Sequence, residues 1–173
     1  MTEVIFVVGG CRSGKSRYAL QLAEDAPEMR KVYVATCIPQ DGEMEDRVAR
    51  HREERGPHWL TMEAPLDLES TLRVQRQEGQ VVLVDCLTMW VSNLLMEDAS
   101  LEQLRARFQD LADVLGSGAG KVILVSNEVG CGVVPDHVLG RTFRDAVGEL
   151  NQAVAGASRT VFWTVAGIPV RVK

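Results

Sequence analysis

Short runs of apolar residues alternate along the chain with longer amphipathic or polar stretches. The runs have the length of strands and are rich in valine; they comprise Val4–Val8, Val32–Ala35, Val81–Val84, Val122–Val125 and Val161–Val165. Because each run is continuously hydrophobic, the pattern predicts parallel strands that are covered on both faces. The segment Ile168–Lys173 at the end of the chain predicts a short antiparallel edge strand.

The stretches between these runs predict helices. Lys15–Ala26 follows the first strand and ends before a proline, while Leu101–Leu115 and Arg141–Ala155 place apolar side chains at helical spacing. Gly156 is expected to end the last of these helices. Strands that alternate with helices predict an α/β fold with a doubly wound, mostly parallel sheet flanked by helices. No linker or repeat divides the chain, so residues 1–173 predict a single nucleotide-binding domain.

A glycine-rich motif joins the first strand to the first helix. It reads Gly9-Gly10-Cys11-Arg12-Ser13-Gly14-Lys15-Ser16 and matches G-x-x-x-x-G-K-[ST] in the strand–loop–helix context that a P-loop requires. Glycines let backbone amides approach phosphate oxygens, and the helix N-terminus adds partial positive charge. Lys15 is expected to reach the β and γ phosphates of a nucleotide during catalysis, and Ser16 to bind Mg²⁺. A chance glycine turn is the alternative, and the strand and helix on either side count against it.

Polar residues also follow two later strands. Asp85 ends the run Val81–Val84, where a carboxylate in a parallel sheet lies close to bound Mg²⁺ and phosphate. Asn127 and Glu128 follow another strand and are candidates for binding substrate, with metal binding as a second possibility for Glu128. The alternatives are an exposed turn aspartate at Asp85 and a plain connecting loop after Asn127.

The segment Asp41–Arg55 predicts a helix that is polar nearly all round. Such a helix has little apolar surface to bury and needs another reason to exist. His51 shares a helical face with Met44 and Val48, and the surrounding arginines favour a neutral imidazole. A neutral imidazole is a competent nucleophile toward phosphorus or a general base. A solvated surface histidine is the alternative.

Composition excludes several classes of function. The formal net charge of -5 argues against broad nucleic-acid binding, although one local positive pocket could still hold a small anion. The four cysteines are far apart, which argues against a zinc site and a disulfide framework and suits free thiols in a reducing cytoplasm. No signal peptide is visible, and no apolar stretch approaches the length of a membrane span.

Together, these segments resemble the adenosylcobinamide kinase/adenosylcobinamide-phosphate guanylyltransferase family of cobalamin biosynthesis over nearly the whole chain. The P-loop is generic, whereas the ordered set of the other matching segments is specific. These segments are Val34-Ala35-Thr36, Glu43-Met44, Arg47-Val48, His51, Arg55, Trp59, Glu63, Asp85-Cys86-Leu87-Thr88, Asn93-Leu94-Leu95, Asn127-Glu128-Val129-Gly130, Val134-Pro135, Arg141, Phe143-Arg144-Asp145, Gly148 and Asn151.

The resemblance implies two reactions. The first phosphorylates adenosylcobinamide with ATP or GTP, and the second transfers GMP from GTP to adenosylcobinamide phosphate, giving adenosyl-GDP-cobinamide. By motif position, His51 would carry the GMP as a covalent intermediate, and the resemblance also implies a homotrimer. The implied nucleotide contacts outside the P-loop are Val34, Ala35, Thr36, His51, Arg52, Glu53, Glu54, Glu63 and Asp85.

Two other functions suit a P-loop: a monofunctional small-molecule kinase, and a nucleotide-switched binding module. The chain lacks the Asn-Lys-x-Asp motif of switch GTPases, and this absence and the helix around His51 count against the module. Two positions depart from the family pattern. Cys11 stands where alanine is common, and Arg50 stands where some relatives have a second histidine, which leaves His51 as the one candidate in its helix.

Overall fold

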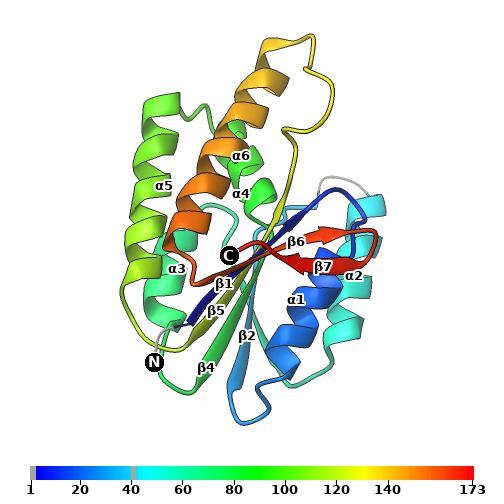
Figure 1. Cartoon of the computed structure of the whole chain (residues 1–173), viewed down its shortest axis with the longest axis vertical. Helices are drawn as coiled ribbons and strands as arrows, with labels where there is room; N and C mark the ends of the chain where they lie inside the picture. The colour runs from blue at the N-terminus through cyan, green and yellow to red at the C-terminus, as the bar shows by residue number, and fades with distance from the viewer. Residues whose placement is uncertain (1–2, 40–41) are drawn as a thin grey trace.

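A computed structural model describes residues 3–39 and 42–173 of the chain. In the helix Gly42–Arg55, the description leaves out the side chains of Glu43, Glu45, Arg47, Arg50, His51 and Glu54. The strands are β1 (Glu3–Gly9), β2 (Arg30–Ala35), β3 (Trp59–Glu63), β4 (Gln80–Asp85), β5 (Lys121–Asn127), β6 (Thr160–Val165) and β7 (Ile168–Arg171). The helices are α1 (Lys15–Glu24), α2 (Gly42–Arg55), α3 (Leu68–Gln75), α4 (Leu87–Met96), α5 (Leu101–Gly116) and α6 (Val138–Ala157) (Figure 1).

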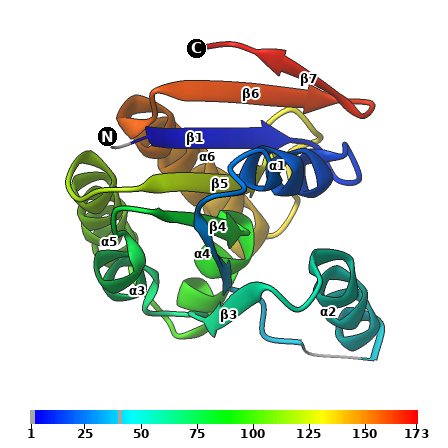
Figure 2. The same cartoon turned by 90° about the horizontal axis from the view of Figure 1, so that it is seen from below.

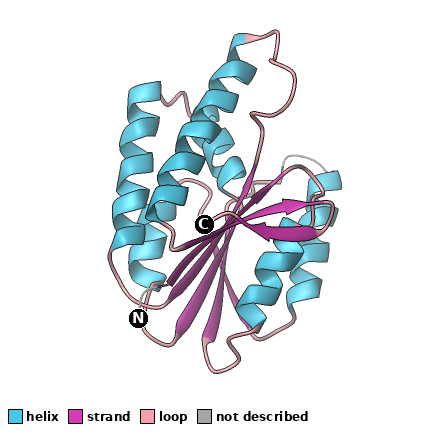
Figure 3. Cartoon of the chain, viewed as in Figure 1, coloured by secondary structure: helices cyan, strands magenta, loops and turns pink. Residues whose placement is uncertain are grey.

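All seven strands of the described residues belong to one sheet, in the order β3-β2-β4-β5-β1-β6-β7. Figure 3 draws the strands in magenta between the helices. Each neighbouring pair is parallel except β6 and β7, which are antiparallel. The predicted doubly wound α/β fold and the antiparallel C-terminal edge strand are therefore confirmed. Among the described residues, no helix is both long and apolar enough to cross a membrane.

The two faces of the sheet carry separate apolar cores. Along β1, Val4 and Phe6 pack with residues of α3, α4, α5 and α6, whereas Ile5 and Val7 pack with Ala19 of α1 on the other face. Figure 2 shows the same two layers, with α1 and α2 on one side of the sheet and the remaining helices on the other. Burial on both faces explains why the strand sequences are continuously hydrophobic.

Three elements, β3, α3 and α4, are not predicted from the sequence. In β3 only Trp59 is buried, because β3 is the edge strand of the sheet, and so its sequence has no apolar run. The helices α3 and α4 are also missed. The buried residues of α4 lie on several sides of the helix, as expected for a short buried helix that lacks a clear period.

Three predicted helix ends are wrong by two residues or more. Helix α1 ends at Glu24 instead of Ala26. Helix α6 begins at Val138, three residues before the predicted start, because the side chain of His137 accepts a hydrogen bond from the Gly140 amide and caps the helix. It also continues through Gly156, since a helical glycine costs only about 1 kcal/mol and Val154 in the same turn is fully buried.

The carboxyl ends of the parallel strands form one edge of the sheet. Gly9 of β1 lies opposite Asn127 of β5, and Ala35 of β2 lies between Glu63 of β3 and Asp85 of β4. Five residues from distant parts of the chain are thus neighbours along this edge. Ligands of open α/β sheets bind here, beyond the carboxyl ends of the strands.

Candidate active site

The P-loop lies at this edge, between β1 and α1, and its shape leaves no room for a side chain at its first glycine. A Cβ atom added to Gly9 would lie 2.5 Å from the carbonyl oxygen of Thr164 and 2.7 Å from Oγ of Ser13. Gly14 has a φ of 91°, which L-residues with side chains rarely adopt. The turn between β6 and β7 supports the loop, because the amide of Gly167 donates a 2.9 Å hydrogen bond to the Ser13 carbonyl.

The polar groups of the loop suit an anion. Lys15 is 8% exposed, and its Nζ donates a 3.1 Å hydrogen bond to the carbonyl oxygen of Gly10. The Oγ atom of Ser13 is buried and has no hydrogen-bond partner in the described part of the chain. No side chain caps α1, and no acidic residue lies in its first turn. The positive N-terminal end of the helix is therefore directed at the loop without a competing carboxylate.

Ser16 and Asp85, the two predicted metal ligands, line one cavity of about 350 Å³. The remaining lining residues are Arg17, Leu20, Tyr33, Arg55 and Leu83. Among the described residues, no cluster of three or more histidine, cysteine or acidic side chains could hold a metal by itself. A hydroxyl and one carboxylate fit Mg²⁺, which is bound in such sites by few protein ligands and completed by phosphate oxygens and water.

Tyr33 and Arg55 were not among the predicted site residues. The guanidinium carbon of Arg55 lies 3.4 Å from the centroid of the Tyr33 ring, and both side chains line the cavity with Asp85. Burial, and then the charge of Asp85, raise the pKa of Tyr33 far above its ordinary value. Burial lowers the pKa of Arg55, whereas Tyr33 and Asp85 act in the opposite direction. In the sequence, Tyr33 reads as one more member of an apolar strand.

Asn127 and Glu128 lie beside the P-loop. The amide of Glu128 donates a 3.0 Å hydrogen bond to the carbonyl oxygen of Gly9, and the amide of Asn127 donates one of 2.7 Å to Oγ1 of Thr88. The Oδ1 atom of Asn127 is buried and has no partner in the described part of the chain. The structure therefore brings both predicted substrate residues to the edge of the sheet that carries the P-loop.

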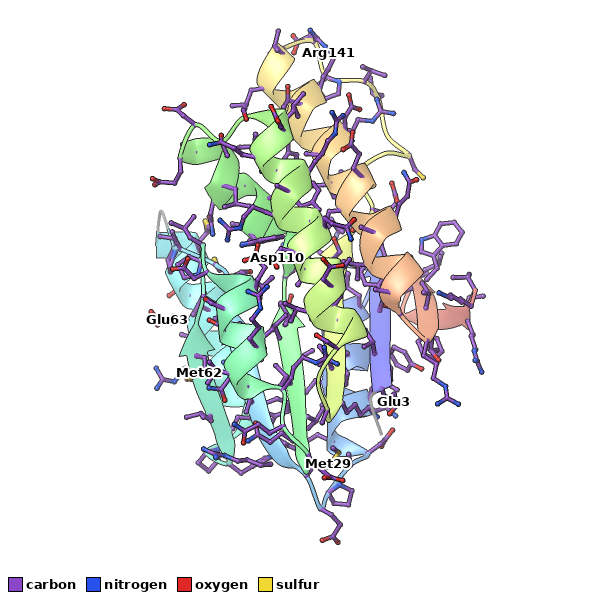
Figure 4. All side chains as sticks on the ribbon, turned by 90° about the vertical axis from the view of Figure 1, so that its left-hand side faces the viewer. Glu3, Met29, Met62, Glu63, Asp110 and Arg141 are labelled. Carbon is purple, nitrogen blue, oxygen red and sulfur yellow. The ribbon has the colours of Figure 1, made fainter. Side chains whose placement is uncertain are left out.

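The arginines of α6 brace the loop that follows Glu128. Arg141 donates hydrogen bonds to the carbonyl oxygens of Pro135 (3.1 Å) and Asp136 (2.7 Å), and Arg144 donates one of 2.8 Å to that of Gly130. Figure 4 shows Arg141 at the far tip of α6. These contacts give both side chains a structural role in holding the loop.

A family model described as cobinamide kinase / cobinamide phosphate guanyltransferase matches residues 5–172. The chain belongs to this family. It is 46% identical over 167 residues to the bifunctional adenosylcobalamin biosynthesis protein CobP of Pseudomonas aeruginosa, covering 96% of this chain and 95% of that protein. It is 37% identical over 182 residues to the bifunctional adenosylcobalamin biosynthesis protein CobU of Escherichia coli, covering 98% of this chain and 99% of that protein.

A second CobU, from Salmonella typhimurium, is 36% identical over 182 residues, again covering 98% of this chain and 99% of the relative. The match extends over nearly the full length of each protein. It therefore includes the strand ends that form the candidate site as well as the P-loop. Membership in the cobinamide kinase / cobinamide phosphate guanyltransferase family is consistent with a P-loop nucleotide-binding fold.

In this family member, the residues at the end of β2 are held firmly. The side chain of Val34 is fully buried in the core, so any contact with a nucleotide would come from its backbone. Oγ1 of Thr36 donates a 2.7 Å hydrogen bond to the carbonyl oxygen of Cys86 and accepts one of 2.9 Å from its amide. Nδ2 of Asn93 donates to the Thr36 carbonyl at 2.7 Å. Thr36 thus joins the end of β2 to the start of α4.

Helix α2 and the end of β3 contribute the remaining predicted residues. Glu63 is exposed at the carboxyl end of β3 (Figure 4), and Arg52 and Glu53 are exposed on α2. Arg52 also lines a second cavity, of about 330 Å³, with Arg55 and Trp59 among its neighbours. The side chains of His51 and Glu54 lie outside the described residues, so the roles predicted for them stay predictions.

Proposed function

We propose that the chain is a bifunctional transferase of adenosylcobalamin biosynthesis, in which His51 carries a covalent guanylyl group. It phosphorylates adenosylcobinamide with ATP or GTP and then transfers GMP from GTP to adenosylcobinamide phosphate, giving adenosyl-GDP-cobinamide. Its family and its near full-length relatives, which are named bifunctional adenosylcobalamin biosynthesis proteins, support this function. The observation that carries it is the P-loop with its buried Lys15, followed directly by Ser16, which lines one cavity with Asp85.

The chain's own groups account for nucleotide binding. The backbone amides of the P-loop and the ammonium group of Lys15 would surround the phosphates of the nucleotide. Ser16 and Asp85 would hold Mg²⁺, which supplies positive charge to the phosphates when bound. Asn127 and Glu128 would face the corrinoid substrate at the neighbouring strand end, and Glu63, Arg52, Glu53 and Glu54 would complete the nucleotide site.

In the first reaction, the hydroxyl oxygen of adenosylcobinamide attacks the γ phosphorus of the nucleotide. The bond between that phosphorus and the bridging oxygen breaks, the nucleoside diphosphate leaves, and the proton of the hydroxyl passes to solvent. Lys15 offsets the charge that collects on the phosphate oxygens as the phosphoryl group moves. This step needs only the P-loop side of the site, so it is also open to a monofunctional kinase.

In the second reaction, a nitrogen of the His51 imidazole attacks the α phosphorus of GTP, and pyrophosphate leaves. An oxygen of adenosylcobinamide phosphate then attacks the same phosphorus, the phosphorus–nitrogen bond breaks, and the imidazole is regenerated. Splitting the transfer into two displacements is the advantage of a covalent intermediate. It requires a neutral imidazole, which the arginine-rich sequence around His51 favours.

Incubation with GTP labelled at the α phosphate tests this proposal. We expect an acid-labile, base-stable label that maps to the peptide containing His51 and disappears in His51→Ala. Lys15→Ala is expected to lose affinity for GTP, measured by calorimetry, and therefore to lose the label as well. Undiminished labelling of His51→Ala would exclude His51 as the nucleophile, while kinase activity without any labelled protein would favour the monofunctional kinase.

We also propose that the chain is a single domain, forms a homotrimer and works in the cytoplasm. The seven strands of one sheet run from Glu3 to Arg171, which supports a single domain. None of the four cysteines, all of which lie in the described part of the chain, forms a disulfide, and this suits a reducing compartment. The trimer rests on the family resemblance.

A further inference from the structure

Helix α2 is attached to the rest of the molecule in an unusual way. Of its side chains that the structure describes, Met44 is half-buried and Arg55 is the only buried one, at 7% exposed. Val48, the apolar residue in the middle of the helix, is 38% exposed. Figure 2 shows α2 beside β3, standing away from the other helices. A polar helix with so little buried apolar surface needs a different kind of attachment.

The buried Arg55 is the last residue of α2, and it reaches the middle of the candidate site. Its guanidinium group stacks over the ring of Tyr33, with 3.4 Å between its central carbon and the ring centroid. It lines the same cavity as Ser16 and Asp85, and the charges of Arg55 and Asp85 attract each other. The side chain of Arg55 therefore connects α2 to the carboxyl ends of β2 and β4.

An arginine suits this attachment better than other residues. One flat face of its guanidinium group can lie against an aromatic ring, while the N–H groups at its edges remain directed toward other partners. A buried charge without a partner would be costly, and both Tyr33 and Asp85 offset that cost here. Lysine would keep the charge but lose the planar stacking.

We propose that Arg55 is a positioning residue for guanylyl transfer. It fixes the C-terminal end of α2 against the metal side of the phosphate site, and so sets the place of the preceding helical turn, which contains His51 four residues earlier. The proposal rests on the nucleophilic role of His51 proposed above. In this proposal, Arg55 holds α2 in place, and the P-loop binds the nucleotide.

Arg55→Met tests the proposal by removing the charge and the stacking group while keeping an apolar stem. We expect the single-turnover rate of protein–GMP formation to fall about 100-fold, as a misplaced reacting group can cost, while GTP affinity measured by calorimetry changes less than about threefold. Amide hydrogen exchange over residues 42–55 should accelerate, and exchange over β1 and α1 should not. Arg55→Lys should give a smaller change in the same direction.

Arg76→Met is the matched control. Arg76 is also a buried arginine, at 6% exposed, with a pKa lowered by burial, but it follows α3 at the opposite end of β4. We expect Arg76→Met to lower the free energy of unfolding. It should leave amide hydrogen exchange over residues 42–55 unchanged, and it should not slow protein–GMP formation beyond any change in GTP affinity. If Arg55→Met does not fold, the same measurements on Arg55→Lys decide.

The outcomes separate this inference from the proposed function. Wild-type labelling, or wild-type exchange over residues 42–55, in the Arg55 variants would overturn the inference. A parallel loss of GTP affinity and labelling would also overturn it, because Arg55 would then act as a phosphate ligand. If the wild-type protein itself takes up no label, the proposed function fails, while the exchange measurement still tests whether Arg55 anchors α2.

Discussion

At the scale of single residues, the P-loop motif requires its first glycine, Gly9, and allows any residue at the next position, and the structure gives a physical reason for this difference. An added Cβ at Gly9 would meet the backbone oxygen of Thr164 at 2.5 Å, whereas an added Cβ at Gly10 would meet no atom within 4 Å. The difference arises from β6, which lies next to β1 but follows it by about 150 residues in the chain. Gly9 is therefore required by packing, whereas a Cβ atom at Gly10 would lie in open space.

We expect Gly9→Ala to lower the free energy of unfolding by about 1–3 kcal/mol, the usual cost of forcing extra atoms into a packed site. The shift of the loop should also weaken GTP binding. Gly10→Ala should change the free energy of unfolding by about 0.5 kcal/mol or less. Urea denaturation of both variants measures the difference, and equal stability of the two would contradict the close contact at Gly9.

At the scale of elements, Glu24 connects the end of α1 to β2 and β3. Its Oε1 atom accepts a 2.8 Å hydrogen bond from Nε1 of Trp59 and lies 3.1 Å from Nε2 of His58, and its Oε2 atom lies 3.6 Å from Nζ of Lys31. His58 thus contributes to the contact between α1 and the start of β3. The cluster keeps α1, and with it the P-loop, against the edge of the sheet that ends in β3.

This cluster predicts a loss of stability in acid. Burial raises the pKa of Glu24, but hydrogen bonds from Trp59 and His58 and the charge of Lys31 outweigh it, so the net pKa is below the ordinary 4.5. The stabilisation is therefore present above about pH 4.5 and is lost as the pH falls through the lowered folded pKa. Because Glu24 is 42% exposed, the effect should not exceed about 1 kcal/mol.

Thermal unfolding measured across the acid range checks this expectation. Glu24→Gln keeps an oxygen that can accept from Trp59 but has no charge to lose, so its stability should fall less steeply in acid than that of the wild type. Glu28→Gln removes an exposed carboxylate outside the cluster and serves as the control. Identical acid profiles for Glu24→Gln and the wild type would show that the cluster contributes nothing.

At the scale of the whole molecule, the order of the strands creates the candidate site. Residues of β1, β2, β3, β4 and β5 meet at one edge although up to 120 or so positions separate them in the chain. The net charge of -5 does not prevent a local cationic site, because Lys15, Arg17 and Arg55 lie at this edge. The order of the strands, and not the net charge of the chain, therefore decides where these cationic side chains gather.

The proposed trimer is tested at the same scale. Light scattering of the purified protein is expected to give a mass three times that of the 19.0 kDa chain. The mass should persist on dilution to the concentrations at which the enzyme is assayed, because subunits separate only when their concentration falls below the dissociation constant of the trimer. A mass of one chain under all conditions would contradict the trimer and leave the proposed chemistry to a single subunit.

Part of the site could be predicted from the sequence because the physics involved is local. The P-loop is a contiguous segment whose glycines and helix start act within a few residues, and Asp85 stands directly after a recognisable buried strand. The parallel fold itself could be predicted, because burial on both faces leaves a continuous apolar run in each strand. His51 was singled out by its polar helix and the family resemblance, and its part in the chemistry is still a prediction.

The sequence by itself determined the fold class, the P-loop between the first strand and the first helix, and the strand ends at which polar residues gather. Only the tertiary structure decided which side chains complete the site. The stacking of Arg55 on Tyr33, the attraction between Arg55 and Asp85, and the bond from Gly167 to Ser13 join residues that are far apart in the chain. The edge strand β3 could not be predicted for a related reason. It has one buried side chain and therefore no apolar pattern, so only its pairing with β2 defines it as a strand.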